Sequence, residues 1–224
     1  MGKVVILPGT TVNPITKMGE MAGVCWGADT GDAERNYKRG LDCIVSGHGR
    51  VMEFVNVEMV LDGYSARVMR EWYTHIGGAP TRLQASTRYI DYGMFENILP
   101  PSIERQEQAK EIYAGAMWQI REAIRQLENM GIPREDAALL LPLGMTTVVV
   151  DKRNLRNLVD MSHTRECVRA NWEFREMFRD LKRALADYSE EWARIVNTQF
   201  MPKCRALGYC PEKNGCGRMK GRTV

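Results

Sequence analysis

The spacing of hydrophobic and polar residues predicts a chain of interleaved strands and helices. Apolar side chains stand at nearly every second position of residues 53–61, which is typical of a strand with one buried face. The β-branched run at residues 146–150 predicts a buried strand, and residues 3–8 predict a short opening strand. A turn is expected at Asp62-Gly63, where the strand pattern stops and a helical pattern begins.

Longer segments carry apolar residues at the spacing of a helix. The longest follows Pro100-Pro101, with Ser102 as the expected N-cap, and its apolar positions are Ile103, Ile112, Ala116, Ile120, Ile124 and Leu127. The other predicted helices are residues 33–45 and 65–74, a short one opened by Pro133, one from about residue 154, and residues 166–185 and 190–197. The chain lacks the regular βαβ repeat and glycine fingerprint of a Rossmann domain. We therefore expect an α+β fold with a twisted, mainly antiparallel sheet framed by long helices.

Composition agrees with one enzyme-sized domain. The 224 residues are 44% hydrophobic, enough for a sizeable core, and we expect one domain at residues 1–200 and a Cys-rich tail at 201–224. The net charge of +3 is spread through amphipathic helices, which argues against a nucleic-acid polymer as partner. No apolar run approaches the ~18 residues that a membrane span needs, and the chain starts without a signal-peptide core. We expect a cytoplasmic protein without membrane contact.

The segment richest in chemistry is residues 70–92, which read REWYTHIGGAPTRLQASTRYIDY. It holds His75, a flexible Gly77-Gly78 pair, and an amide, a hydroxyl and a guanidinium on Gln84, Ser86 and Arg88. Such donors suit phosphate oxygens, which a guanidinium binds through two parallel hydrogen bonds. The other interpretation of the same residues is an edge strand whose polar side chains face water.

These residues and several further motifs resemble one family. Gln84, Ser86, Arg88 and Tyr89 match the Ser-x-Arg-Tyr element of flavin-dependent thymidylate synthases, the ThyX family. Similar motifs stand in the family's order at residues 23–26 (GVCW), 46–54 (SGHGRVMEF), 131–159 (GIPREDAALLLPLGMTTVVVDKRNLRNLV) and 165–173 (RECVRANWE). The resemblance covers roughly residues 20 to 216. Several motifs in order are far more specific than any one alone.

The resemblance implies a flavin-dependent reaction on a pyrimidine nucleotide. In the family, reduced FAD, generated by NADPH, and methylenetetrahydrofolate convert dUMP to dTMP without a cysteine nucleophile. The enzyme must therefore bind a phosphate dianion, polarise the uracil carbonyls and stack a flat cofactor. The family also builds its active sites from several subunits, so the resemblance implies a homotetramer.

Carried over residue by residue, the resemblance assigns roles to the matching positions. Ser86 and Arg88 would hold the nucleotide phosphate, with Gln84 beside them, and Glu71 stands where the family often contacts the nucleotide. Arg165 would face the uracil and stabilise charge on its carbonyls, so we take Arg165 and Ser86 as the catalytic candidates.

The flavin contacts would come from His75, Arg153 and Asn157. The last two lie four positions apart, hence on one face of the helix expected from about residue 154. These residues also have ordinary structural interpretations. Arg153 and Asn157 suit a solvated helix face, and His75 suits a hydrogen-bonded loop position.

Some positions depart from the family's pattern. Thr74 and Ile76 replace the two arginines of an Arg-His-Arg triplet, of which only His75 remains. The others are Asp151 for an Asn, Glu71 for a Gln, Phe54 for a His and Ala138 for an Arg. Each lost charge-assisted hydrogen bond costs about 1.5–3 kcal/mol of binding. Arg67, Arg70, Arg82 or backbone amides of the Gly77-Gly78 loop are the candidates to compensate.

Cysteines suggest a metal in the tail. Cys204, Cys210 and Cys216 recur every six residues in a Gly- and Pro-rich segment with few apolar residues. With Cys167 they would form a closed four-sulfur site suited to structural Zn²⁺ or to an iron–sulfur cluster. The alternative is free or transiently oxidised thiols in a reducing compartment. Cys25 and Cys43 are expected in the core.

Two other functions agree with the same residues. A related flavin or folate enzyme that modifies a different pyrimidine nucleotide would account for the altered triplet. A non-catalytic nucleotide-binding homologue would keep the Ser86–Arg88 element beside a degraded flavin site.

Overall fold

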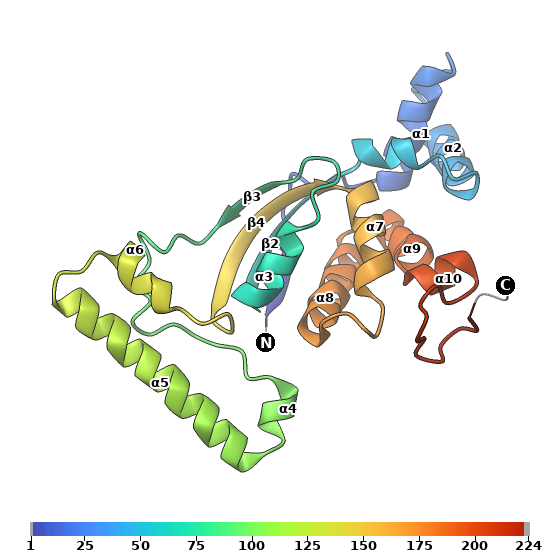
Figure 1. Cartoon of the computed structure of the whole chain (residues 1–224). Coiled ribbons are helices and arrows are strands. Elements are labelled where there is room, and N and C mark those ends of the chain that lie inside the picture. The colour runs from blue at the N-terminus through green and yellow to red at the C-terminus, as the bar shows by residue number, and fades with distance from the viewer. Residues whose placement is uncertain (1, 222–224) are drawn as a thin grey trace. The chain divides into compact units, whose positions relative to one another are not determined.

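Four strands form one sheet in the computed structural model, which describes residues 2–221 (Figure 1). Their order is β1 (Lys3–Ile6), β2 (Asn56–Ser65), β4 (Thr146–Asn154) and β3 (Thr81–Gln84), so β1 and β3 are the edges. The sheet is antiparallel and helices dominate the rest of the chain, which confirms the expected α+β class. Within the described residues, no helix combines the length and apolar character needed to cross a membrane.

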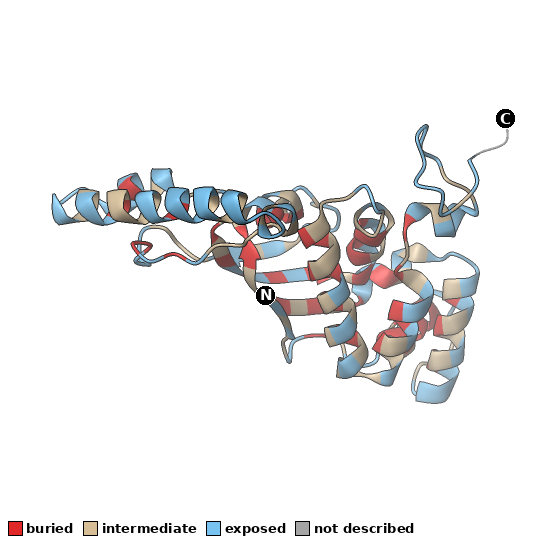
Figure 2. Ribbon diagram, turned by 90° about the horizontal axis from the view of Figure 1, so that it is seen from below, coloured by how far each residue is buried: buried red, intermediate tan, exposed pale blue. Residues whose placement is uncertain are grey.

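The two central strands bury alternate side chains. Val57, Met59 and Leu61 of β2 are fully buried, and Thr147 and Val149 of β4 are buried as well. Figure 2 shows buried residues interspersed with less buried ones along the strands. The strand expected at 146–150 is present, but only one face of it is buried, because Val148 and Val150 are partly exposed. Successive side chains of a strand point to opposite faces of the sheet, so every second residue of β4 is buried and the residues between are more exposed.

The expected turn at Asp62-Gly63 is wrong. Strand β2 continues through both residues to Ser65, and Gly63 alone takes a left-handed conformation, with φ of 75°. Glycine adopts this conformation without steric cost, so the strand changes direction there without ending. The strand also begins later than expected, because residues 49–54 form the 3₁₀ helix η1 (Gly49–Phe54).

Two compact units divide the described chain, and the division passes through the strands. The first unit holds residues 2–3, 61–73 and 83–149, and the second holds 4–60, 74–82 and 150–221. The boundary expected at residue 200 stays a prediction, with the tail counted in the second unit.

The first unit packs its helices around a small aromatic and aliphatic core. The core contains Tyr92, Phe95, Met117, Ile124, Ala137 and Met145. The helical elements are α3 (Ala66–Tyr73), α4 (Pro101–Glu104), α5 (Glu107–Asn129), α6 (Arg134–Ala137) and the 3₁₀ helix η2 (Ala138–Leu140). Figure 1 shows α5 as the longest helix, lying beside α6.

The long helix differs from its prediction in two respects. Ser102 is not its N-cap, because Ser102 lies inside α4 and the extended backbone of Gln106 separates α4 from α5. Ile112 is not a core position, since 68% of it is exposed. The predicted positions Ile120, Ile124 and Leu127 do face the core, together with Met117 and Tyr113, which the prediction left out.

The second unit is a helical assembly. Its helices are α1 (Pro14–Cys25), α2 (Ala33–Val45), α7 (Leu155–Arg165), α8 (Trp172–Tyr188), α9 (Glu190–Gln199) and α10 (Lys203–Leu207). Helix α7 and α9 agree with prediction, but the helix expected from residue 166 begins only at Trp172. Asn171 is its N-cap and accepts hydrogen bonds from the backbone N–H of Glu173 at 2.9 Å and of Phe174 at 3.4 Å. Cys167 therefore lies in a loop, not at a helix start.

Helix α1 was absent from the predicted elements because its N-terminus is capped from far away. Glu191 of α9 accepts hydrogen bonds from the backbone N–H of Ile15 at 2.6 Å and of Thr16 at 2.9 Å. Asn13, the local cap residue, makes no side-chain cap hydrogen bond. A carboxylate at a helix N-terminus also meets the positive end of the helix dipole.

Glycines let α1 and α2 approach each other closely. A Cβ at Gly19 would overlap the backbone carbonyl oxygen of Asn36, and one at Gly40 would overlap that of Ile15. Both obstacles are backbone atoms, which cannot rotate away as a flexible side chain can. The helices would have to move apart to admit even a methyl group.

Gly40→Ala should therefore lower the free energy of unfolding by about 1–3 kcal/mol, the usual cost of overpacking. Gly115→Ala is the matched control, because Gly115 also lies inside a helix but a Cβ there meets nothing within 4 Å. That control should gain about 0.5–1 kcal/mol from better helix propensity. Urea denaturation followed by circular dichroism measures both. Equal effects of the two substitutions would contradict close packing of α1 on α2.

Candidate functional site

The first cluster of predicted site residues lies at the end of the edge strand β3 and in the turn that follows it. We call it the Arg88 cluster: Gln84, Ser86 and Arg88. The Ser86 hydroxyl oxygen accepts a hydrogen bond from the backbone N–H of Arg88 at 3.2 Å. Gln84 Nε2 donates to the hydroxyl of Thr147 on β4 at 3.4 Å. The edge-strand interpretation is thus right for residues 81–84, while Ser86 and Arg88 lie beyond the strand.

The guanidinium of Arg88 in this cluster forms an ion pair with the carboxylate of Glu135. Arg88 Nε lies 2.6 Å from Glu135 Oε2 on α6, and the two side chains are 67% and 51% exposed. Arg134, the neighbour of Glu135, donates to the backbone oxygen of Tyr89 at 3.1 Å. An ion pair this exposed is worth only about 0.2–1 kcal/mol, so an anionic ligand can displace it. Glu71, the other predicted nucleotide contact, is half-buried on α3.

The second cluster joins residues that lie far apart in sequence. We call it the His75 cluster: His75, Arg165 and Phe174. Arg165 Nε donates to His75 Nε2 at 2.9 Å, across 90 positions of sequence. The Arg165 guanidinium carbon lies 4.6 Å from the centre of the Phe174 ring, and His75 meets that ring edge-on at 6.1 Å. The guanidinium of Arg165 therefore donates to the lone pair of His75 Nε2 and also lies over the aromatic ring of Phe174.

His75 must be neutral for this arrangement. Burial lowers the pKa of His75 from 6.5 to about 4, and the charges of Arg165 and Arg153 contribute in the same direction. An imidazolium would carry a proton on Nε2 and could not accept from Arg165. The neutral ring with its proton on Nδ1 is thus the form that binds Arg165 at physiological pH.

Arg153 and Asn157 meet, but not on one helix face. Arg153 belongs to β4, Asn157 to α7, and Arg153 Nη1 donates to Asn157 Oδ1 at 2.6 Å. Arg153 also pairs with both carboxylate oxygens of Asp151, at 2.5 and 2.6 Å, and neither charged side chain is exposed. The interpretation of Arg153 as part of a solvated helix face is wrong. Its assignment as a flavin contact stays a prediction.

The glycine pair of the signature loop packs against the start of α7. A Cβ on Gly77 would lie 2.9 Å from Asn157 Nδ2, and one on Gly78 would overlap the side chain of Asn154. Gly78 and Ala79 both take left-handed conformations, with φ of 72° and 50°. Close packing is therefore a structural reason for the glycines, besides their predicted role as anion-binding amides.

The departures from the family pattern occupy different environments. Asp151 is fully buried against Arg153, while Phe54 is 57% exposed and Ala138 begins η2. Sequence reasoning missed three partners: Glu135, Phe174 and the pairing of Asp151. Only the pairing of Asp151 with Arg153 could have been predicted from the sequence, because residues two apart in a strand lie on the same face.

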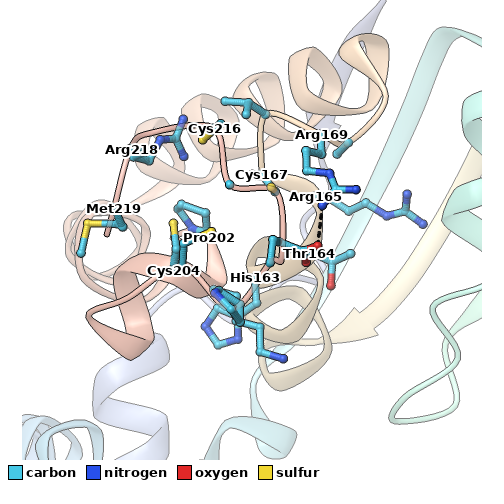
Figure 3. Close-up of a pocket in the computed structure, with 17 residues that line it drawn as sticks. His163, Thr164, Arg165, Cys167, Arg169, Pro202, Cys204, Cys216, Arg218 and Met219 are labelled. Atoms are coloured by element: carbon cyan, nitrogen blue, oxygen red, sulfur yellow. Dashed lines mark hydrogen bonds and ion pairs between the residues drawn. The ribbon is translucent and has the colours of Figure 1, made fainter. Parts of the chain in front are cut away.

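The predicted metal ligands line one cavity of the second unit. Cys167, Cys204, Cys210 and Cys216 surround a space of about 430 Å³ between the loop after α7, α10 and the tail (Figure 3). All six cysteines are unpaired. Among residues 2–221, no three His, Cys, Asp or Glu side chains lie together as closely as metal ligands do. Of the two cysteines expected in the core, Cys43 is buried and Cys25 is exposed.

The chemistry of the second unit fits an anionic, flat cofactor such as FAD. The His75 cluster combines an imidazole and a guanidinium with an aromatic face. Arg175 follows Phe174 on α8, and its buried Nε makes no hydrogen bond among the described residues. The loop at residues 76–79 is exposed, so a ligand can approach its backbone.

The fold is α+β, and each of the two clusters contains one guanidinium, that of Arg88 or that of Arg165. A family model described as thymidylate synthase complementing protein matches residues 9–189. The chain belongs to this family, so the resemblance found in its motifs is confirmed.

Relatives and a solved structure agree with this assignment. The chain is 30% identical over 206 residues to a flavin-dependent thymidylate synthase of Nitratidesulfovibrio vulgaris, covering 84% of this chain and 80% of that one. It is 30% identical to that of Pyrococcus abyssi over 172 residues, 75% and 69% of the two chains. The crystal structure of thymidylate synthase X from Helicobacter pylori with FAD and dUMP matches the fold with a TM-score of 0.64 at 16% identity, covering 88% of this chain and 99% of that one.

His75 should stay neutral until the pH falls to about 4. Because its folded pKa lies below the unfolded value of 6.5, its contribution to stability is complete above 6.5 and is lost as pH falls toward 4. Histidine NMR titration, with His75→Gln used for assignment, measures the midpoint. Arg165→Gln should raise that midpoint, because it removes a neighbouring positive charge. A midpoint near 6.5 in the native protein would contradict a buried, Arg165-bound imidazole.

Proposed function

We propose that this protein converts dUMP to dTMP with FAD as its redox cofactor, methylenetetrahydrofolate as carbon donor and NADPH as reductant. The observation that carries the proposal is the hydrogen bond between His75 and Arg165, which joins two family motifs in one cluster. The Helicobacter pylori structure with FAD and dUMP supports the choice of ligands.

Arg88 and Ser86 bind the phosphate of dUMP in this proposal. The dianion replaces the Glu135 carboxylate at the Arg88 guanidinium, and a phosphate offers two oxygens to the planar fork where the carboxylate now sits. Ser86 adds a hydroxyl donor, and Gln84 and Glu71 complete the nucleotide contacts. The exchange costs little, because the exposed ion pair contributes little.

Arg165 carries the catalytic step at the base. Its guanidinium has more N–H donors than the one that His75 accepts, so it can polarise a uracil carbonyl while remaining held. The guanidinium stabilises the negative charge on that oxygen while C5 forms the new bond to the one-carbon unit and then loses its proton to solvent. Bound reduced FAD supplies the hydride that brings this unit to the methyl level as tetrahydrofolate leaves.

His75 and Asn157 are the residues we assign to FAD. His75 presents its neutral ring beside Phe174, and Asn157 stands at the start of α7 against the Gly77-Gly78 loop. Arg153 belongs to the same assignment as a positioning residue, because its Nη1 fixes the Asn157 side chain while Asp151 neutralises it. NADPH and methylenetetrahydrofolate act as co-substrates without assigned residues.

A homotetramer in the cytoplasm completes the proposal. The first unit exposes many large apolar side chains, among them Leu83, Tyr89, Met94, Trp118 and Leu139, each at least 60% exposed. Exposed apolar surface on this scale supports a subunit interface, and closed symmetric oligomers are the usual form. Dissociation to a monomer at micromolar concentration, measured by light scattering, would remove this part.

The decisive assay is tritium release from 5-tritiated dUMP. The protein, supplied with FAD, NADPH and methylenetetrahydrofolate, should release tritium to water because C5 exchanges its hydrogen for carbon. Thr74 and Ile76 in place of arginines favour one alternative, an enzyme that modifies another pyrimidine nucleotide. Release from other tritiated pyrimidine nucleotides but not from dUMP would replace our proposal with that one. Nucleotide binding without any release would point to a non-catalytic homologue.

Arg88→Ala should weaken dUMP binding by about 1.5–3 kcal/mol, the value of a charge-assisted hydrogen bond, and leave FAD occupancy unchanged. Glu135→Gln is the matched control. It removes the competing carboxylate, so dUMP affinity should stay equal or rise. Calorimetric titration with dUMP and with deoxyuridine measures the phosphate contribution. Equal affinity of the native protein for both ligands would refute the assignment of Arg88 to the phosphate.

A further inference from the structure

The cavity of the second unit has an excess of positive charge. Its space of about 430 Å³ is lined by Arg165, Arg169, Lys203 and Arg218, and the only carboxylate among the described lining residues is that of Glu212. Four positive charges and one negative charge leave the lining with a net charge of +3. The net charge of the whole chain is also +3, so the remaining residues are balanced as a group. The unbalanced positive charge of this protein therefore lies around one cavity.

These cations come from different segments and have weak partners or none. Arg169 follows α7 and Arg218 lies in the tail, and Figure 3 labels both beside the same space. Arg169 pairs with Glu212 at 2.6 Å, but both side chains are about half exposed. Arg218 Nη1 donates to the backbone oxygen of Glu166 over a long 3.4 Å, and neither Arg218 nor Lys203 forms an ion pair among residues 2–221. An exposed ion pair contributes little, so an anionic ligand can replace Glu212 at Arg169.

The rest of the lining is suited to an organic ligand. Val168, Pro202, Pro211 and Met219 supply apolar surface beside the cations. The volume of about 430 Å³ lies within the range of small-molecule sites, and one inorganic anion would leave most of it to water. The four cysteines of the lining do not lie together as metal ligands do, so the cations rather than the sulfurs determine which ligand the cavity attracts.

We propose that this cavity binds the phosphate groups of a multiply phosphorylated nucleotide. A single phosphate monoester carries about two negative charges at neutral pH, which is less than the net charge of the lining. Guanidinium groups bind phosphate oxygens in pairs and an ammonium group binds them as a point charge, so Arg169, Arg218 and Lys203 are complementary donors. The apolar residues then contact the sugar or the base.

This site is distinct from the phosphate site assigned to Arg88. All the residues that line the cavity belong to the second unit, whereas Arg88 belongs to the first. One wall consists of residues 202–219, which follow the part of the chain that the family model matches. Arg165 is the one residue that the cavity shares with the His75 cluster.

Two nucleotides have the required chemistry. NADPH carries a pyrophosphate and a 2′-phosphate, and it is the co-substrate of the proposed function that has no assigned residues. A nucleoside triphosphate carries comparable charge and would act as an effector instead. The two sources share their phosphate chemistry, and the relative affinities of NADPH and ATP distinguish them.

The first test is calorimetric titration of the full chain saturated with FAD. ATP should bind at least about tenfold more tightly than AMP, because the additional phosphates meet additional cations. Lys203→Ala and Arg218→Ala should each weaken ATP binding by about 10- to 100-fold, the effect of one lost charge-assisted hydrogen bond. Lys213→Ala is the matched control, because Lys213 is an exposed cation of the same tail that does not line the cavity. It should change the affinity by less than about twofold.

The cavity cysteines provide a second, local readout. Saturating ATP should slow the alkylation of Cys204 and Cys216 in the native protein, measured by mass spectrometry, because both thiols line the occupied space. Cys25 is the control thiol, since it is exposed on α1 and should react at an unchanged rate. Thermal melting of each variant shows whether lost binding reflects lost folding. The three substituted cations are exposed, so the melting temperature should stay unchanged.

The outcomes separate the possibilities. Tighter binding of NADPH than of ATP or NADH assigns the cavity to the co-substrate, and tighter binding of ATP than of NADPH assigns it to an effector. Equal affinities for AMP and ATP, equal losses in Lys213→Ala and Lys203→Ala, or unprotected thiols would overturn the proposal. Protection of Cys204 and Cys216 by FAD alone would also overturn it, because the cavity would then belong to the cofactor. None of these measurements requires turnover of dUMP, so they stand apart from the tritium-release assay.

Discussion

The buried ion pair of Asp151 with Arg153 is the interaction on which the second unit depends. Both side chains are completely buried, and the guanidinium binds both carboxylate oxygens. Removing one partner from such a pair typically costs about 3–5 kcal/mol, because the other charge remains buried without compensation. The pair stands where β4 ends and α7 begins, so it fixes the register of the strand against the helix that carries Asn157 and Arg165.

The charge of Arg153 also acts at a distance on the candidate site. Together with Arg165, it lowers the pKa of His75, although burial has the larger effect. The neutral imidazole then becomes an acceptor for Arg165, which lies against Phe174. The His75 cluster therefore holds one positive charge, on Arg165, beside an imidazole that stays neutral. This is the electrostatic environment that an anionic cofactor or a developing negative charge on a base requires.

Several elements that depend on local residues were predicted, although their boundaries and caps were often wrong, and partners distant in sequence were not predicted. The α+β class, α7 and α9 follow from periodicity and local motifs. Helix α1 did not, because Glu191 caps it from the other end of the chain. The partners of Arg88 and Arg165 likewise lie far away in sequence, at Glu135 and His75, and tertiary packing alone brings them together.

The altered triplet can be understood from this packing. With Thr74 and Ile76 the loop lacks the two positive charges of the family's arginines, yet His75 keeps a guanidinium neighbour, because Arg165 at the end of α7 lies beside it. Gly77 and Gly78 then let the loop lie directly on Asn157 and Asn154, where a larger side chain would collide. The loop thus lacks positive side chains of its own, but it packs closely against the start of α7. A site built this way depends on the positions of β4, α7 and the following loop, rather than on the residues that flank His75.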